Sequence, residues 1–437
     1  MTERYWAEHA WLPSGVASGV LIEVTDGRIT AVSTPVEPSP GVVRLAGLTL
    51  PGLANAHSHA FHRGLRGRTQ ADRGTFWTWR EQMYALAATL TPDRYHALAR
   101  AVYTEMVLTG ITCVGEFHYV HHAPGGAPYA DPNAMGEALI AAAADAGIRV
   151  TLLDTCYLTG GFDRPLEDVQ LRFGDTTAER WAERVSALRP DGGHVRIGAA
   201  LHSVRGVPRE QIGPVVEWAA ATGAPLHVHL SEQPAENEAC LAAHGVTPTR
   251  LLADAGALGP RTTAVHATHL TPADIALLGA TRTVACACPT TERDLADGIG
   301  PIRTLFEAGS PVSLGSDSHA VIDLFEEARA VELDERLRTR ERGHWRAAEL
   351  LRTAFAHDSL GWPDAGALEV GARADLVTIR TDTIRTAGFT PATAAETAVF
   401  AAGGADVASV IVDGRAVVTD GVHATVDAGR ELARALA

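Results

Sequence analysis

A regular alternation of short apolar segments with longer amphipathic or Ala-rich segments runs through the middle of this chain. The apolar segments have strand length and the intervening segments have helix length, so the pattern predicts repeated β–α units. Eight such units over about 270 residues match a (β/α)8 TIM barrel, an α/β fold of typically ~250 residues. A doubly wound open sheet is the alternative, because periodicity alone does not separate the two folds. We expect strands at 48–56, 111–117, 149–155, 195–201, 225–230, 263–268, 282–287 and 312–317.

Both ends of the chain are rich in β-branched residues. The N-terminal part contains Asp26-Gly27 between two such runs, and the C-terminal run 409–418 contains Asp413-Gly414. Asp-Gly is a favoured two-residue hairpin turn. We therefore predict that residues 1–48 and 366–437 come together as a small β-sandwich domain. Residues 49–365 would then form the barrel and hold the functional site.

The basic residues of this chain are all arginine, because its 437 residues include no lysine. This excludes a Schiff-base lysine, a P-loop lysine and a carbamylated lysine that bridges two metal ions. The 37 basic residues stand against 52 acidic ones, which gives a formal net charge of −15. Such a charge repels phosphate backbones, so we expect no nucleic-acid partner.

The location of the protein is also constrained by its sequence. No run of eighteen apolar residues occurs, so we expect no membrane partner, and the N-terminal residues lack the pattern of a signal peptide. The five cysteines are scattered and odd in number, which is typical of reduced thiols. We therefore expect a cytoplasmic protein.

Five of the expected strands end in a histidine or an acidic residue that could take part in chemistry. In a barrel, catalytic side chains project from the C-terminal ends of the strands. The five strand ends read NAHSH (55–59), LHSVR (201–205), HVHLSE (227–232), VHATH (265–269) and GSDSH (315–319). Each string alone also fits a surface histidine, a core-edge histidine or a turn aspartate. Their combination at successive strand ends favours a catalytic site.

His57 and His59 are two residues apart, so on an extended strand they face the same side and can chelate one metal ion. His229 and Asp317 would add a third nitrogen and an oxygen from other strands. Three imidazoles and a carboxylate suit a divalent ion such as zinc and leave room for an activated water. A metal site of this kind lowers the pKa of the water from 15.7 to about 7.

The strings PGLANAHSH, HVHLSE, VHATH and GSDSH together resemble the amidohydrolase superfamily, specifically its mononuclear deaminase branch. The resemblance covers nearly the whole chain, since ALEVGARADLVTI is similar to the segment by which these enzymes re-enter their small β-domain. The absence of lysine agrees with a mononuclear site. The resemblance implies one divalent metal ion per subunit, with zinc favoured, bound by His57, His59, His229 and Asp317.

Three further strings, FWTWREQMY (76–84), GEFHYVHH (115–122) and LHSVRG (201–206), resemble the formimidoylglutamate deiminase family within that branch. This resemblance implies a homodimer that hydrolyses N-formimino-L-glutamate to N-formyl-L-glutamate and ammonia in histidine degradation. It also implies that Glu232 shuttles protons and that His266 and Asp317 assist catalysis. The implied substrate contacts are Arg80, Tyr119, His202 and Arg205.

His62 is a departure from the resemblance, because it stands where the family has a substrate-contacting glutamine. We retain His62 as a candidate substrate contact. The three histidines of the string GEFHYVHH, namely His118, His121 and His122, receive no role.

The substrate implied by the resemblance is a small dianion derived from an amino acid, with a cationic amidine-like head. Arginine binds carboxylates through paired hydrogen bonds, which fits Arg80 and Arg205 on expected active-face loops. A solvated surface position is the alternative for either arginine. The alternative function is a mononuclear amidohydrolase with a ring substrate, such as a guanine- or adenosine-type deaminase or an imidazolonepropionase. A further alternative is a barrel that has lost catalysis and serves as an assembly or binding protein. Such a chain should have lost ligands, whereas all the expected metal and proton-transfer residues are present.

Overall fold

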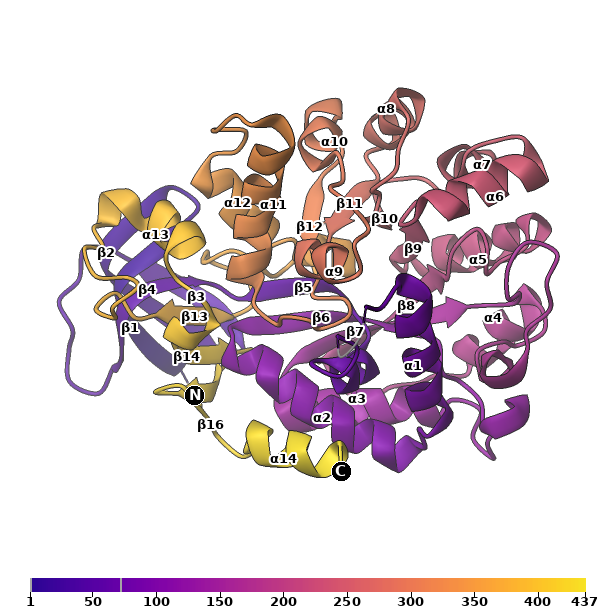
Figure 1. The fold of residues 1–437 in the computed structure, drawn as a ribbon. Coiled ribbons are helices and arrows are strands. Elements are labelled where there is room, and N and C mark those ends of the chain that lie inside the picture. Colours follow the sequence, from indigo (N-terminus) through magenta and orange to yellow (C-terminus); the bar gives the residue numbers. More distant parts are fainter. Residues whose placement is uncertain (1, 71–72) are drawn as a thin grey trace.

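The computed structural model describes residues 2–70 and 73–437, and in this part of the chain the strands form two eight-stranded sheets (Figure 1). The sheet in the middle of the chain is parallel, and its strands lie in sequence order from β5 to β12. Its strands are β5 (Leu53–Ser58), β6 (Ile111–His118), β7 (Arg149–Cys156), β8 (Val195–Leu201), β9 (Leu226–Leu230), β10 (Thr262–His266), β11 (Val284–Ala287) and β12 (Val312–Leu314).

The parallel sheet closes on itself where its first and last strands meet. Ser58, at the end of β5, pairs in parallel with Asp317, just beyond β12. The backbone N–H of Asp317 donates to the carbonyl of His57 at 3.0 Å, and the N–H of His59 donates to the carbonyl of Asp317 at 3.3 Å. The barrel prediction is therefore confirmed, and the open-sheet alternative is excluded.

Helices surround the barrel and connect its strands (Figure 1). Several begin with proline at the first helical position, where the missing N–H has no helical partner to lose. In α2 and α8 the preceding threonine, Thr91 or Thr271, accepts a backbone N–H of the first turn. The helices are α1 (Phe76–Ala88), α2 (Pro92–Leu108), α3 (Ala134–Ala146), α4 (Ala178–Ser186), α5 (Arg209–Thr222), α6 (Pro234–His244), α7 (Pro248–Asp254), α8 (Pro272–Thr281), α9 (Pro289–Asp294), α10 (Ile302–Ala308), α11 (Leu324–Thr339), α12 (Ala347–Thr353), α13 (Ala394–Phe400) and α14 (Ala428–Ala435).

The N- and C-terminal segments form the second sheet, seen at the left of Figure 1, where indigo and yellow strands lie together. Hydrogen bonds join the strands in one mixed sheet in the order β16-β15-β14-β13-β4-β1-β2-β3, and the sheet has an apolar core of its own. The strands are β1 (Thr2–Leu12), β2 (Gly15–Thr25), β3 (Arg28–Ser33), β4 (Val43–Pro51), β13 (Leu376–Ile379), β14 (Val407–Val412), β15 (Arg415–Thr419) and β16 (Val422–His423).

Both Asp-Gly pairs join antiparallel strands of this terminal sheet. Asp26 and Gly27, with φ of 51° and 76°, connect β2 to β3. Asp413 and Gly414, with φ of 46° and 76°, connect β14 to β15. Positive φ at both central residues matches the turn that suits the twist of a hairpin. The hairpin predicted at Asp26-Gly27 is therefore confirmed, and Asp413-Gly414 forms a second one.

The strand expected at 48–56 is wrong in one respect, because the structure divides it into β4 and β5 at Gly52. A Cβ atom at Gly52 would lie 2.2 Å from Thr112 Oγ1 and 2.8 Å from the Cβ of Asp375. Glycine therefore lets the backbone pass from the terminal sheet into the barrel, where no side chain fits.

A buried ion pair joins the barrel to the terminal sheet. Arg149, the first residue of β7, is 0% exposed and binds both carboxylate oxygens of Asp375, which directly precedes β13. Its Nη1 also lies 3.2 Å from Asp413 Oδ1, in the β14–β15 turn.

None of the helices in the described residues has both the length and the apolar composition that crossing a bilayer requires.

Candidate metal centre

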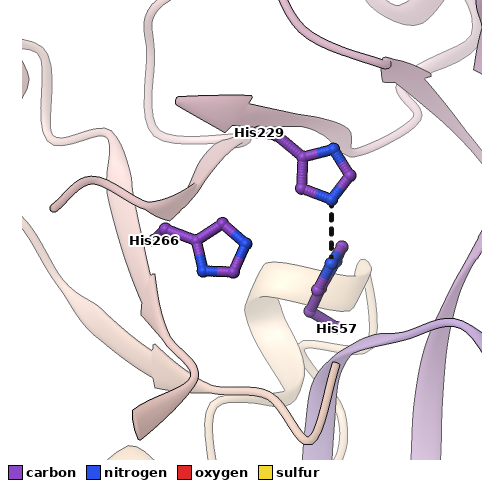
Figure 2. Close-up of side chains that lie close together, drawn as sticks. All are labelled: His57, His229 and His266. Atoms are coloured by element: carbon purple, nitrogen blue, oxygen red, sulfur yellow. Dashed lines mark hydrogen bonds between the residues drawn. The ribbon is translucent and has the colours of Figure 1, made fainter. Parts of the chain in front are cut away.

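The metal ligands expected from the sequence converge at the carboxyl ends of the barrel strands. His57 lies near the end of β5, His229 lies in β9 and His266 is the last residue of β10. Figure 2 shows these three imidazoles pointing toward a common space from separate strands. His59 follows β5 and Asp317 follows β12, so both lie at the barrel seam beside this space.

The distances between donor atoms fit one shared metal ion. The Nε2 atom of His229 lies 3.1 Å from Nε2 of His57 and 3.3 Å from Nε2 of His59. Asp317 Oδ1 lies 3.3 Å from Nε2 of His57 and 3.5 Å from Nε2 of His59. Tetrahedral zinc with Zn–N bonds near 2.0–2.1 Å separates its ligand atoms by about 3.3–3.4 Å.

The tautomers of two of these histidines also fit a bound cation. Nδ1–H of His59 donates to the carbonyl of Phe117 at 2.9 Å, and Nδ1–H of His229 donates to the carbonyl of His202 at 2.8 Å. In the neutral rings both Nε2 atoms are therefore unprotonated, and their lone pairs face each other. Such a contact is repulsive unless a cation lies between the two nitrogens, so these residues fit a metal ion.

The charges of the ligand groups match their metal-binding forms. Burial lowers the pKa of His57, His59 and His229, which keeps the imidazoles neutral. Burial alone would raise the pKa of Asp317, but its hydrogen bond to His57 and the neighbouring histidines hold that pKa well below its usual range. Neutral imidazoles and an ionised carboxylate are the forms that bind a divalent ion.

His266 lies beside this centre and carries a different charge. Its Nε2 is 3.7 Å from both Glu232 Oε1 and Asp317 Oδ2, and its Nδ1 is 3.4 Å from Glu292 Oε1. Burial opposes protonation of the ring, but Glu232 and the hydrogen bond to Glu292 raise the pKa of His266 well above its usual value. A protonated imidazole there can donate a hydrogen bond toward the metal side of the site.

The backbone is strained at the strand ends that carry these groups. Positive φ values occur at Ser231 (52°), His266 (68°), Ala267 (51°), Asp317 (38°) and His319 (59°). L-residues rarely adopt this region, and such strain persists where the surrounding contacts hold it in place. Three strand ends that position site residues, those of β9, β10 and β12, therefore share the same unusual geometry.

A buried polar network joins the end of β5 to the segment after β12. Asn55 Nδ2 donates to Ser316 Oγ at 2.7 Å, and the backbone N–H of Ser316 donates to Asn55 Oδ1 at 2.9 Å. The ring nitrogens of His319 lie 3.0 Å from Ser316 Oγ and 3.2 Å from Ser58 Oγ. Because these residues alternate with the expected metal ligands along both segments, the network contributes to the spacing between those expected ligands.

Glu116 of β6 completes this network from the neighbouring strand. The Ser58 hydroxyl donates to its Oε2 and the backbone N–H of Ala60 donates to its Oε1, both at 2.7 Å. Burial raises the pKa of Glu116 to about 7, although both hydrogen bonds oppose this shift. Sequence reasoning missed Glu116, because a single glutamate within an apolar strand has no distinguishing pattern.

A cavity opens above the metal donors, and together with the open solvent at its mouth it encloses about 650 Å³. Part of its wall consists of aromatic residues that were not predicted to belong to the site, among them Trp79, Tyr84, Tyr157 and Phe173. The wall also includes the candidate catalytic residues Glu232, His266 and Asp317. The further candidate His62 lines this cavity together with the four substrate contacts implied by the resemblance, namely Arg80, Tyr119, His202 and Arg205. Their roles as contacts stay predictions.

Both arginines of the cavity are held by neighbouring side chains. Arg80 Nε donates to the Tyr84 hydroxyl at 2.8 Å, and its guanidinium lies 5.0 Å from the centre of the Tyr84 ring. Arg205 Nε donates to Glu236 Oε2 at 2.9 Å, and the Glu236 carboxylate is buried. These contacts orient two permanent positive charges on the cavity wall.

His62 lies between the metal centre and the cavity. Its ring centre is 4.5 Å from that of His59, and its Nε2 lies 3.0 Å from the Tyr119 hydroxyl. Burial lowers the pKa of His62 to about 3, so the ring is neutral. The neighbouring His202 ring packs against Tyr157 with ring centres 4.0 Å apart, a contact that the sequence pattern did not reveal.

The unassigned histidines of the string GEFHYVHH belong to a separate buried cluster. His121 Nε2 donates to the carbonyl of Thr155 at 2.9 Å, and His118 packs against His121. The nearby Asp154 carboxylate already binds Arg184 through two hydrogen bonds of 2.8 and 3.0 Å. Because a guanidinium occupies this carboxylate, the cluster does not favour a second metal ion.

A parallel barrel with three neutral histidines and a carboxylate at its strand ends defines a metal-dependent hydrolase of the barrel class. The profile of the Amidohydrolase family matches residues 48–417 of this chain. The chain belongs to the amidohydrolase family, whose members include hydrolases of C–N bonds.

Two relatives in sequence are deaminating enzymes by name. A formimidoylglutamate deiminase from Pseudomonas aeruginosa is 37% identical over 389 residues, which cover 86% of this chain and 85% of that protein. An 8-oxoguanine deaminase from the same organism is 31% identical over 387 residues, covering 85% and 84% of the two chains.

Solved structures share the whole fold. The crystal structure of an amidohydrolase from Brucella melitensis is 32% identical, with a TM-score of 0.93 and 99% of both chains covered. The zinc complex of the atrazine chlorohydrolase TrzN from Arthrobacter aurescens is 25% identical, with a TM-score of 0.87 and 99% of both chains covered.

Proposed function

We propose that this protein is a formimidoylglutamate deiminase, which hydrolyses N-formimino-L-glutamate to N-formyl-L-glutamate and ammonia. The observation that carries this proposal is the position of Arg80 and Arg205 on the same cavity wall as the metal donors. Two fixed cations beside a metal centre suit a substrate with two carboxylates. The relative of that name, at 37% identity, supports the same assignment.

In this proposal the arginines bind the glutamate carboxylates, and the formimino carbon lies toward the metal ligands. His57, His59, His229 and Asp317 would hold one divalent ion, and zinc suits this donor set. His62 would contact the substrate as a neutral ring, together with Tyr119 and His202.

The bound ion would supply Lewis acidity that makes a water nucleophilic at neutral pH. Glu232 would accept a proton of that water and deliver it to the imino nitrogen. His266, held as a cation by Glu232 and Glu292, would donate a hydrogen bond to the oxygen that attacks the carbon. The bond from carbon to the imino nitrogen breaks, and this nitrogen gains both hydrogens of the water. It leaves as ammonia from the neutral imine and as ammonium from the cationic head.

The same proposal places the reaction in histidine degradation and the enzyme in the cytoplasm as a homodimer. No polymer partner such as nucleic acid is part of the proposal, because the formal net charge is −15.

A ring-substrate deaminase is the second candidate, favoured by the aromatic residues of the cavity wall and by the 31% identical 8-oxoguanine deaminase. The test is ammonia release from N-formimino-L-glutamate by purified protein of measured metal content. 8-Oxoguanine, guanine and adenosine are assayed for ammonia release in parallel, and imidazolone propionate is assayed for ring opening, which releases no ammonia. We expect chelator-sensitive release from formiminoglutamate alone. Release from a ring substrate by the metal-loaded protein, without release from formiminoglutamate, would overturn the substrate assignment.

A further inference from the structure

Asp297, in the loop after α9, is a buried acid beside the proposed proton shuttle. Asp297 is 3% exposed. A carboxylate oxygen of Asp297, a carboxylate oxygen of Glu232 and a ring nitrogen of His266 all lie within 4.8 Å of one another. Glu232 lines the cavity, so the two carboxyl groups form a pair that extends from the cavity into the protein.

The loop that carries Asp297 is fixed to the segments on either side. The side-chain amide of Gln233, the residue after Glu232, donates to Asp297 Oδ1. The backbone N–H of Asp297 donates to the carbonyl of Glu292 at 2.9 Å, and its own carbonyl lies 2.8 Å from His269 Nε2. Asp297 is therefore held in place beside Glu232, and the Gln233 contact ties the Asp297 loop to the segment that carries Glu232.

The second oxygen of Asp297 is buried and has no hydrogen-bond partner in the described part of the chain. Burying an ionised carboxylate oxygen without a partner costs free energy, and two carboxyl groups this close do not both ionise readily. A single proton shared between Asp297 and Glu232 relieves both costs. Burial and the charge of Glu232 raise the pKa of Asp297 to about 9, in agreement with a protonated state at neutral pH.

The proposed reaction moves two protons through Glu232 in succession, so Glu232 must be ready to accept a proton twice in each turnover. When an imine nitrogen becomes ammonia, two protons pass from water to that nitrogen, whereas one carboxyl group holds one proton at a time. The first proton moves from water to Glu232 and then to nitrogen. The second moves from the new hydroxyl group by the same route, after which carbon–nitrogen cleavage leaves the carbonyl product.

We propose that Asp297 is a positioning residue that shares a proton with Glu232 and sets the protonation state of Glu232 between the two transfers. The pair begins and ends each turnover with one proton, so no external acid or base is consumed. This inference rests on the proposed shuttle role of Glu232. It does not depend on which substrate is deaminated, because a ring deamination also transfers both protons of water, one to the ring nitrogen and one to the leaving amino group.

The experiment compares Asp297→Asn with the matched control Asp294→Asn, an exposed acid in the same segment. We expect Asp297→Asn to lower kcat about ten-fold or more at neutral pH, with KM and bound metal unchanged. The alkaline limb of the kcat profile should also move, because the shared proton is gone. Asp294→Asn should match the wild type in kcat, KM, bound metal and the pH profile of kcat. The substrate is the one that the ammonia-release panel identifies.

The pH profile is interpreted against all charged groups that face Asp297. These groups are Glu232, His266, His269, Glu292 and Asp317. An independent measurement is the infrared difference spectrum of wild type minus Asp297→Asn at neutral pH. We expect a deuterium-sensitive band of a protonated carboxyl group, which does not require turnover.

Two results would overturn the inference. One is an Asp297→Asn enzyme with wild-type kcat and an unchanged pH profile. The other is a joint loss of bound metal and thermal stability with a changed KM and no infrared band. That result would make Asp297 a purely structural residue. A wild-type enzyme that ignores formiminoglutamate but deaminates a ring would contradict the substrate proposal and leave this test intact.

Discussion

Glu232 follows His229 by three residues, and its carboxylate lies 3.7 Å from His266 Nε2 on the wall of the cavity. In this position it can transfer protons without taking part in the set of metal donors. Burial raises the pKa of Glu232, although the positive charge of His266 partly offsets the shift. A carboxyl group with a raised pKa can act as both acid and base near neutral pH.

We expect Glu232→Gln to retain its metal and to lose at least ~100-fold in kcat, because the amide cannot transfer protons. Ammonia release and metal analysis on the same preparation measure both effects. Glu238→Gln, an exposed glutamate in α6, is the control and should keep full activity. A metal-loaded Glu232→Gln enzyme with a near-wild-type rate would remove Glu232 from the mechanism.

The two cavity arginines are tested together. Arg80→Met and Arg205→Met should each raise KM or lower kcat/KM for formiminoglutamate by about 10-fold or more, since a charge-assisted hydrogen bond contributes ~1.5–3 kcal/mol. The exposed Arg209, at the start of α5, provides the control Arg209→Met. If both cavity variants kept wild-type steady-state kinetics, neither arginine would bind a carboxylate.

At the scale of elements, local signals in the sequence predicted most of the barrel. The strand expected at 111–117 is β6 (Ile111–His118), and Asp26-Gly27 forms the expected hairpin. The break at Gly52 could not be predicted, because it depends on Thr112 and Asp375, which are distant in the sequence. For the same reason Glu116 and Asp297 were missed, since a lone acid in a strand or loop gains its meaning only from its neighbours in space.

The network around Glu116 connects β5, β6 and the segment after β12. Glu116→Ala leaves the Ser58 hydroxyl and the Ala60 N–H without their acceptor, so we expect a loss of about 1–3 kcal/mol in the free energy of unfolding. We also expect weaker zinc retention, because Ser58 lies between two metal ligands. Urea unfolding of metal-free protein and zinc release to a chelator measure the two effects. Glu116→Gln keeps an acceptor oxygen, so it should lose less unfolding free energy and less zinc than Glu116→Ala. Equal losses in the two variants would contradict this account.

At the scale of the whole molecule, the Arg149–Asp375 pair holds the barrel and the terminal sheet together. Removal of Asp375 would leave the buried Arg149 charge with only its 3.2 Å contact to Asp413. We therefore expect Asp375→Ala to destabilise the protein by about 3–5 kcal/mol at neutral pH. Asp382→Ala, at an exposed aspartate just after β13, is the control and should leave the free energy of unfolding nearly unchanged.

The pH dependence of this effect has a definite sign. Burial alone would raise the pKa of Asp375, but Arg149 lowers it below its usual value. A carboxylate whose folded-state pKa is lowered contributes stability above its unfolded pKa of about 3.9 and loses it as the pH falls through the folded pKa. The stability gap between wild type and Asp375→Ala should therefore be full at pH 7 and narrow only below about pH 4. A gap that stays constant down to pH 2 would exclude the ion pair as its source.

The barrel seam has a consequence for how the protein matures in the cell. Two of the metal ligands lie at the end of the first barrel strand, and Asp317 lies beyond the last one. During synthesis the histidines leave the ribosome early, but the carboxylate that completes the set emerges only after the last barrel strand. A nascent chain therefore has no complete set of ligands until nearly the whole barrel has been translated. We therefore expect metal binding to follow the closure of the barrel.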